Sequence, residues 1–284
     1  MTKAHVARAV AVLALAAGLT GCGGEDGTGK GGDTRARPGA TPPVRAVQDA
    51  YRKTVAADTA RMTVTTRVVA EGQALTAHGG GVADLRDGTS RVTLTSQGTT
   101  VEQRVVDGVV YQKPSGGRGG SVPGGKTWMK IDLARLTRQG SAGRSQVTDP
   151  AEPVRYLKHI GSGDVTRLGT RTVDGTRTTH YRVSVPVSAL SRGDKGQEQE
   201  LRRQLGKSSL PVDLWLDERG RLRQESVRLA LRPLKQRTPG KEDTTVTSTT
   251  VLRFTDYGTA VDVTAPPAGD TADVTDRMAR AAAG

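Results

Sequence analysis

The sequence predicts an α+β domain, in which a large, strongly bent antiparallel sheet packs against a few helices. Three observations lead to this prediction: strand-like segments alternate apolar and polar residues, Asp-Gly dipeptides separate several of them, and few segments have helical periodicity. Because each strand keeps one polar face, the sheet is expected to be buried on one side and solvated on the other, as antiparallel sheets commonly are.

A short amphipathic helix is expected to open the domain. Val47, Tyr51 and Val55 recur at helical spacing, and Lys and Arg occupy the opposite face. Segments 149–160 and 187–206 are also expected to be helical. These helices cover part of the apolar face of the sheet, and periodicity leaves open whether the remainder is a packed core or a ligand cavity.

The strands are predicted from an alternation with a period of two. Asp87-Gly88, Asp107-Gly108 and Asp174-Gly175 are expected hairpin turns, because Asp and Gly tolerate the positive φ of tight turns, and Asp217–Gly220 is expected to be a longer hairpin loop. The apolar positions of the strands are Met62, Val64, Val68, Val92, Leu94, Met129, Ile131, Leu133, Tyr181, Val183, Val185, Val212, Leu214, Leu216, Val227, Leu229 and Leu231.

Residues 1–21 have the layout of a lipoprotein signal peptide. A short basic region precedes an apolar run that is too short to span about 30 Å of hydrocarbon. The run ends in Leu-Thr-Gly-Cys at 19–22, which looks like a bacterial lipobox, so Cys22 is the expected attachment point of a diacylglycerol. Two acyl chains are sufficient for stable anchoring. The alternative is an ordinary signal peptide with an incidental cysteine; a disulfide framework is excluded because Cys22 is the only cysteine.

The chain is expected to divide into four parts. After the signal peptide, residues 22–43 contain the lipidated cysteine and a Gly-rich segment without periodicity, which is typical of a flexible tether. Residues 44–267 form the sheet-and-helix domain, and residues 268–284 are expected to be a C-terminal tail. This order places the domain at the outer face of the cytoplasmic membrane, held by its lipid anchor.

The formal charge of +13 indicates which partners are plausible. Removal of the signal peptide takes away Lys3 and Arg8 and leaves +11 (13 − 2). Such a charge favours anionic lipid headgroups or cell-wall polymers, whereas export argues against nucleic acid. The alternative is a solvated surface with no specific partner, and the sequence identifies no protein partner.

No constellation of catalytic or metal-binding residues stands out. His5 belongs to the signal peptide, and His78, His159 and His180 lie far apart without metal-ligand spacing. A Gly-x-Ser-x-Gly elbow is absent, and the segment 206–208 (GKS) lacks the earlier glycine of a phosphate-binding loop. The sequence therefore predicts neither an enzyme nor a cofactor, and His180 is expected to face away from the apolar side of its strand.

Four segments carry a family resemblance over roughly residues 42–267. The segments are GGKTWMKIDL (124–133), GDVTRLGTRTVDGTRTTHYRVSV (163–185), LPVDLWLDERGRLRQ (210–224) and FTDYGTAVDVTAPP (254–267). In this order they resemble the actinobacterial lipoproteins of the LppX/LprG type, whose fold is similar to that of the periplasmic carriers LolA and LolB.

The resemblance implies a half-barrel of antiparallel strands wrapped over helices, with an apolar cavity that holds the acyl chains of lipids or glycolipids. Thr66, Ser248 and Thr250 at inward positions, together with a single Phe, indicate a small or single-chain lipid, or a cavity filled by side chains. The first reading predicts a lipid binder or carrier, and the second predicts an anchored sensor or scaffold. The residues expected to line the cavity are Val64, Val68, Leu94, Val183, Leu214 and Leu229.

Overall fold

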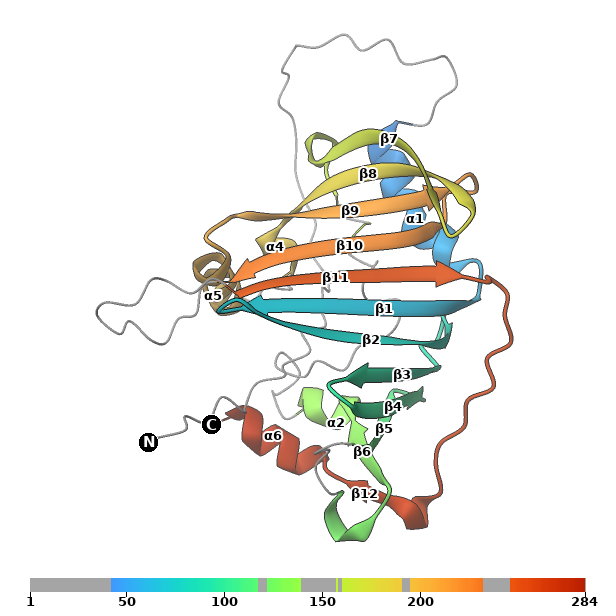
Figure 1. The fold of residues 1–284 in the computed structure, drawn as a ribbon, viewed down its shortest axis with the longest axis vertical. Coiled ribbons are helices and arrows are strands. Elements are labelled where there is room, and N and C mark those ends of the chain that lie inside the picture. The colour runs from blue at the N-terminus through green and yellow to red at the C-terminus, as the bar shows by residue number, and fades with distance from the viewer. Residues whose placement is uncertain are drawn as a thin grey trace, which may run out of the picture.

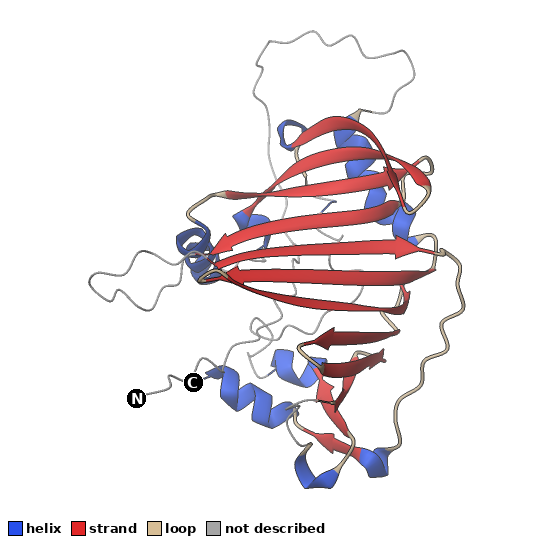
Figure 2. Ribbon diagram, in the orientation of Figure 1, coloured by secondary structure: helices blue, strands red, loops and turns tan. Residues whose placement is uncertain are grey.

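One large open sheet dominates the computed structural model, which describes residues 42–116, 122–138, 157, 160–190, 195–231 and 246–283. The sheet has twelve strands in the order β12-β6-β5-β4-β3-β2-β1-β11-β10-β9-β8-β7 (Figures 1 and 2). Only the pair β12–β6 is parallel, and the other neighbours pair antiparallel. The predicted α+β class with a large curved antiparallel sheet is confirmed.

The strands follow the predicted alternation closely. Their bounds are β1 Thr59–Ala70, β2 Gln73–Asp84, β3 Ser90–Ser96, β4 Thr99–Val106, β5 Val109–Ser115, β6 Trp128–Asp132, β7 Val165–Val173, β8 Thr176–Pro186, β9 Ser209–Asp217, β10 Leu222–Leu231, β11 Val246–Thr255 and β12 Thr271–Asp273.

The helices of the described residues are α1 Pro43–Val55, α2 Leu133–Arg138, α4 Val187–Leu190, α5 Lys195–Leu205 and α6 Thr275–Ala283, with 3-10 turns η1 Pro123–Gly125, η4 Ser162–Asp164 and η5 Ala268–Asp270. Among them, α1, α4 and α5 contact strands β7, β8 and β10, whereas α2 and α6 contact β5 and β6. The predicted opening helix is α1, and the predicted helical segment 187–206 contains α4 and α5. Most of the segment 149–160 lies outside the described residues.

The register between strands shows which side chains share a face, because directly opposite residues of an antiparallel pair point to the same side. Val64 on β1 lies opposite Leu252 on β11 and Gly79 on β2, and Gly79 lies opposite Leu94 on β3. We call the face that carries these residues the inner face. Helix α1 lies behind β8 to β10 in the view of Figure 1 and packs against this face.

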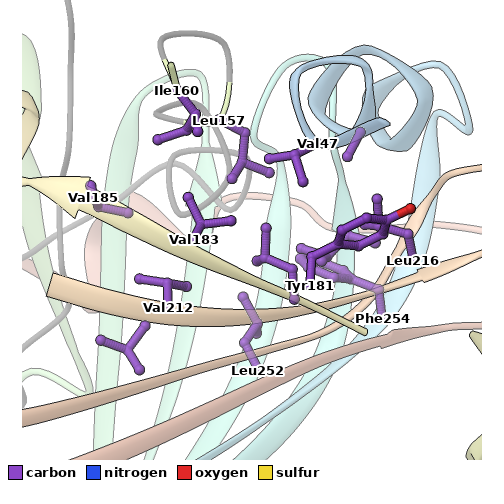
Figure 3. Packing of buried hydrophobic residues seen from close by; sticks show 14 of the residues in the cluster. Val47, Leu157, Ile160, Tyr181, Val183, Val185, Val212, Leu216, Leu252 and Phe254 are labelled. Atoms are coloured by element: carbon purple, nitrogen blue, oxygen red, sulfur yellow. The ribbon is translucent and has the colours of Figure 1, made fainter. Parts of the chain in front are cut away.

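The main hydrophobic core forms between α1 and the inner face of β8 to β11. Val47 of α1 is fully buried and belongs to one cluster with Tyr181 and Val183 of β8 and with Leu252 and Phe254 of β11 (Figure 3). Burial of such side chains is the main source of folding free energy, at about 1.5–3 kcal/mol for each large aliphatic residue. This core holds the helix against one half of the sheet.

A second core lies at the other half of the sheet, and the C-terminal segment is part of it. Val105, Val110 and Ile131 from β4 to β6 pack with Val274 and Ala279. Residues 271–273 add strand β12 to the sheet edge, and α6 covers the cluster. Residues 268–283, set apart from the domain by the sequence analysis as a C-terminal tail, are therefore folded onto it, because the chain beyond 267 returns to an otherwise unpaired strand edge.

The sheet bends sharply between β2 and β3, where β2 contains three consecutive glycines. A Cβ on Gly79 would lie 2.3 Å from the carbonyl oxygen of Thr93, and one on Gly81 would lie 1.8 Å from that of Arg91. Both positions face inward, so the backbone of β3 passes over the inner side of β2. No side chain larger than hydrogen fits there, and the glycines thus permit the bend.

Two of the three predicted Asp-Gly turns are confirmed by their backbone angles; at Asp87-Gly88 only Gly88 has positive φ, and residues 85–89 form a longer loop between β2 and β3. Asp107 and Asp174 have φ of 52° and 46°, and the glycine after each also has positive φ. Two further hairpin turns, Glu71–Gly72 and Gln97–Gly98, have the same conformation and were missed because Glu and Gln are uncommon at such positions.

The hydroxyl of Tyr257 joins three elements at the right-hand end of the sheet in Figure 1. It donates a hydrogen bond to the carbonyl oxygen of Leu222, whose own N–H donates to Thr54 Oγ1 of α1 at 2.9 Å. The guanidinium of Arg221 lies 4.4 Å from the centre of the Tyr257 ring. Burial is the main reason why the pKa of the Tyr257 phenol lies above its usual range.

Replacing Tyr257 by phenylalanine is expected to lower the free energy of unfolding by about 1–2 kcal/mol at pH 7, because the Leu222 carbonyl loses its donor. A phenol whose pKa is raised by folding stabilises the protein fully below its unfolded pKa of about 10 and loses this contribution as pH rises further. In denaturant unfolding, the difference in the free energy of unfolding between the parent protein and Y257F should therefore decrease above about pH 10. Y111F is the control, because the Tyr111 hydroxyl has no hydrogen-bond partner among the described residues; an equal loss in both variants would contradict the assignment.

Candidate functional site

The inner face is mostly apolar, although Gln103 and Gln112 also lie on it and are joined by a hydrogen bond of 3.0 Å, and its burial is uneven. Strand pairing places apolar residues on the same face from β1 through β2 and β3 to Val101 on β4. In the other direction, it does so from β1 through β11 to β8. The two cores bury the inner face at both ends of the strand order. The main core also buries the end of the central strands at which β1 begins. What remains is the opposite half of β1 to β4, near the hairpin turns at Gly72 and Gly98.

We call this remaining part of the inner face the central strip. Its members are aliphatic, half-buried and placed on four neighbouring strands: Val64, Val68, Leu75, Leu94 and Val101. Four strands at about 4.8 Å spacing make the strip about 14 Å wide. Val64 packs against the main core, and the other four belong to neither core of the described residues, so their side chains offer a surface to an apolar ligand.

The structure places the six predicted lining residues on one face, but in two different surroundings. Val183 and Leu214 are 0% exposed and Leu229 is 4% exposed, all within the main core (Figure 3 shows the surroundings of Val183). Val64, Val68 and Leu94 are half-buried members of the central strip. Alternation put all six on the apolar side, and it could not distinguish the side chains that the main core buries from those that stay half-buried.

Polar groups interrupt the strip on its β11 side. Thr66 lies opposite Thr250, and their hydroxyl oxygens are 3.1 Å apart, so the two groups satisfy each other by a hydrogen bond. Ser248 lies opposite Val68 on the same face. These are the inward polar positions expected from the sequence, and they limit the aliphatic surface to β1 through β4.

A buried carboxylate on the inner face was not anticipated. Glu225 is 6% exposed and lies opposite Leu252 on one side and Leu214 on the other. The sequence carried the signal, because Glu225 has the same parity as Val227 and Leu229 on β10. Burial of a charge is costly unless other groups compensate it, and Glu225 does have an interaction partner among the described residues.

His180 faces the outer side of the sheet, as expected. Its ring stacks on Trp215 with 4.3 Å between ring centres and 6° between planes, and its Nε2 lies 3.0 Å from Asp213 Oδ1. Within the described ranges, no group of three or more His, Cys, Asp or Glu side chains could hold a metal ion. Cys22 and the expected tether lie outside the part of the chain that the structure describes.

The fold and its face define a class of protein: an α+β domain built on one open, mostly antiparallel sheet whose apolar face is only partly covered by the helices of the described residues. Among the helices of the described residues, none combines the length and the apolar composition needed to cross a bilayer.

Two curated proteins are similar to this chain over most of its length, although no model of a known protein family matches it. One is an "Uncharacterized 31.2 kDa protein in rplA-rplJ intergenic region" of Streptomyces griseus, which is 28% identical over 81% of this chain and 79% of that protein. The other is a "Putative lipoprotein" of Streptomyces coelicolor, which is 28% identical over 95% of this chain and 93% of that protein.

Solved structures similar to this chain include two mycobacterial lipoproteins. LppX of Mycobacterium tuberculosis has a TM-score of 0.45 with 16% identity, over 78% of this chain and 99% of that one. LprF of Mycobacterium bovis has a TM-score of 0.42 with 12% identity, over 79% of this chain and 96% of that one. A LolA superfamily protein of Nitrosomonas europaea has a TM-score of 0.28 with 12% identity, over 76% of this chain and 93% of that one. The resemblance to LppX/LprG-type lipoproteins is thus found by these comparisons as well.

Proposed function

We propose that this protein is an exported lipoprotein, anchored through Cys22 at the outer face of the cytoplasmic membrane, which binds or carries one acyl chain of a lipid or another apolar ligand on the inner face of its sheet. The observation that carries the proposal is the central strip, a half-buried aliphatic surface between two packed cores. The name of the Streptomyces coelicolor relative supports the lipoprotein part.

The energetics support a single chain. Each methylene moved fully from water to an apolar surface contributes about 0.8 kcal/mol, so burial of about ten methylenes of one acyl chain supplies the roughly 8 kcal/mol that micromolar binding requires. The Thr66–Thr250 pair between β1 and β11, together with Ser248, interrupts the aliphatic surface on one side. A ligand with several long chains would have to contact these hydroxyls, which argues for a small or single-chain lipid.

A cavity filled by side chains supports a second reading. Val183, Leu214 and Leu229 are packed in the main core and present no surface to a ligand. If the strip is covered in the same way, the domain acts as an anchored sensor or scaffold that binds a protein or wall polymer. Lipid binding separates the two proposals.

The variant Val68→Asp tests the lipid site. A carboxylate in the central strip opposes contact with methylenes, so binding of the fluorescent fatty acid cis-parinaric acid to V68D is expected to weaken by about tenfold or more, equivalent to about 1.4 kcal/mol. The measurement is a fluorescence titration, accompanied by mass spectrometry of lipid co-purified with the parent protein.

The matched control is Val69→Asp, the same change on the adjacent residue of β1. Val69 lies opposite Thr247 and Ala74 on the outer face, so V69D should bind the fatty acid like the parent. Equal weakening in both variants would place binding elsewhere. A parent without co-purified lipid, whose thermal midpoint does not respond to added fatty acid, would favour the scaffold reading.

A further inference from the structure

A row of four side chains crosses the outer face of β8 to β11. His180 lies opposite Trp215, Trp215 opposite Gln224, and Gln224 opposite Arg253. The His180 and Trp215 rings are stacked, and Arg253 Nε donates to Gln224 Oε1 at 2.7 Å. The row is therefore a connected surface with an aromatic part and a hydrogen-bonding part.

Asp213 keeps the aromatic part in place. Its carboxylate lies 3.0 Å from His180 Nε2 and accepts two hydrogen bonds from Arg182 at 3.0 and 3.1 Å. The bidentate pair leaves the charge of Asp213 matched by that of Arg182. Asp213 thus fixes the His180 ring through Nε2, and the ring stacks on one face of Trp215.

The turn between β7 and β8 reaches over this row. Asp174, at the turn, lies 3.7 Å from Arg253 Nε although β7 is four strands away from β11 in the sheet. Thr176 beyond the turn accepts a hydrogen bond from Arg223 at 3.1 Å. A register shift between Arg167 and Gly169 interrupts the pairing of β7 with β8, and such a bulge increases the local bend of the strand. The hairpin therefore forms a roof over the row.

Between the roof and the row lies a groove of about 390 Å³ that is open to solvent. This volume lies within the range of about 300–1,000 Å³ that is typical of small-molecule sites. The lining joins side chains of the roof to those of the row: Arg171, Thr172, Val173, Asp174, His180, Trp215, Gln224 and Arg253.

The lining combines an aromatic ring with planar polar groups and an excess of positive charge. Asp174 is matched by Arg253, so Arg171, which is exposed, contributes the surplus charge of the groove. An indole ring attracts the polarised C–H groups of a sugar face, while amide and guanidinium groups pair with hydroxyls and carboxylates. A purely apolar ligand would leave these polar groups unpaired.

We propose that this outer groove binds a saccharide ring that carries a carboxylate, as found in acidic glycans, with Trp215 contacting the ring and Arg171 pairing with the carboxylate. This site is independent of the lipid site, because the groove and the central strip lie on opposite faces of the sheet. A chain anchored at a membrane would then hold a lipid on one face and an acidic glycan on the other.

Galacturonic acid and galactose test the proposal, because they share a ring and differ in the carboxylate. Ligand-observed NMR titration of the parent protein is expected to give a dissociation constant about tenfold lower for galacturonic acid than for galactose. Trp215→Ala should abolish binding of both sugars. Arg171→Ala removes an exposed side chain, so it should fold normally, retain galactose binding and lose the preference for galacturonic acid.

Arg91→Ala is the matched control, because Arg91 is an exposed arginine on the outer face of β3, away from the groove. It should keep the tenfold preference. The proposal is overturned if the parent binds neither sugar, if galactose binds as tightly as galacturonic acid, or if R171A keeps the preference. A negative result with the sugars does not change the expected result of the fatty acid titration of V68D. The two proposals can therefore be contradicted independently.

Discussion

Replacing Gly81 by alanine is expected to destabilise the folded protein by about 3 kcal/mol, at the upper end of the usual cost of overpacking. The added Cβ would lie 1.8 Å from the carbonyl oxygen and 2.8 Å from the carbonyl carbon of Arg91. Both atoms belong to the backbone of β3, so no side-chain rotation relieves the clash. Equilibrium unfolding in urea, followed by circular dichroism, measures the loss.

Gly80→Ala is the control for this prediction. Gly80 lies on the same strand but faces outward, and a Cβ there would lie 3.3 Å from the carbonyl oxygen of Met62 and 3.5 Å from Thr63 Cγ2. A small adjustment accommodates these contacts, and the change is expected to stay within about 0.5 kcal/mol, because alanine also reduces the entropy of the unfolded chain. If G80A and G81A have the same free energy of unfolding, the backbone of β3 does not approach β2 as closely as described.

Replacing Phe254 by alanine is expected to cost about 4 kcal/mol, the typical price of removing a fully buried aromatic side chain. Phe254 is the only phenylalanine of the chain, and its side chain is 0% exposed in the main core (Figure 3). It lies opposite Met62 on β1 and shares its cluster with Val47 of α1. The loss of its ring leaves a cavity between helix and sheet, which thermal and denaturant unfolding would both report.

Leu168→Ala controls for the removal of apolar atoms as such. Leu168 is a large hydrophobic residue that is 45% exposed, so its truncation creates no cavity and should change the free energy of unfolding by less than about 0.5 kcal/mol. A large loss in L168A, or a small one in F254A, would mean that the core is not organised around β11 and α1.

Much of the sheet could be predicted because its signals are local. Alternation along single strands identified the inner-facing side chains, and Asp-Gly dipeptides identified the turns at 107–108 and 174–175, where φ is positive at both residues. His180 on the outer face and Thr66 on the inner face followed from the same parity. The parity of Glu225 was equally visible, and its burial on the apolar face could have been noted.

The candidate sites depended on contacts that no local pattern contains. Val68 and Val183 have similar sequence environments, yet the first remains half-buried and the second is covered completely, because Val183 belongs to the main core, which also contains Leu157 and Ile160, and Val68 belongs to neither core (Figure 3). The outer groove requires Asp174 to meet Arg253, which is 79 residues away (253 − 174). The returning C-terminal segment likewise pairs with β6 only in the folded chain.

By itself, the sequence determined that this protein has a sheet with one apolar face, tight turns and few helices, since these properties arise within a few residues of chain. It also predicts a signal peptide and lipidation at Cys22 and carries the resemblance to envelope lipoproteins. Only the tertiary structure decided where the sheet bends, which side chains of the apolar face the cores of the described residues bury and which outer side chains form a groove. These features result from packing between strands and helices distant in sequence, and side-chain volume and backbone approach determine them only once the chain has folded.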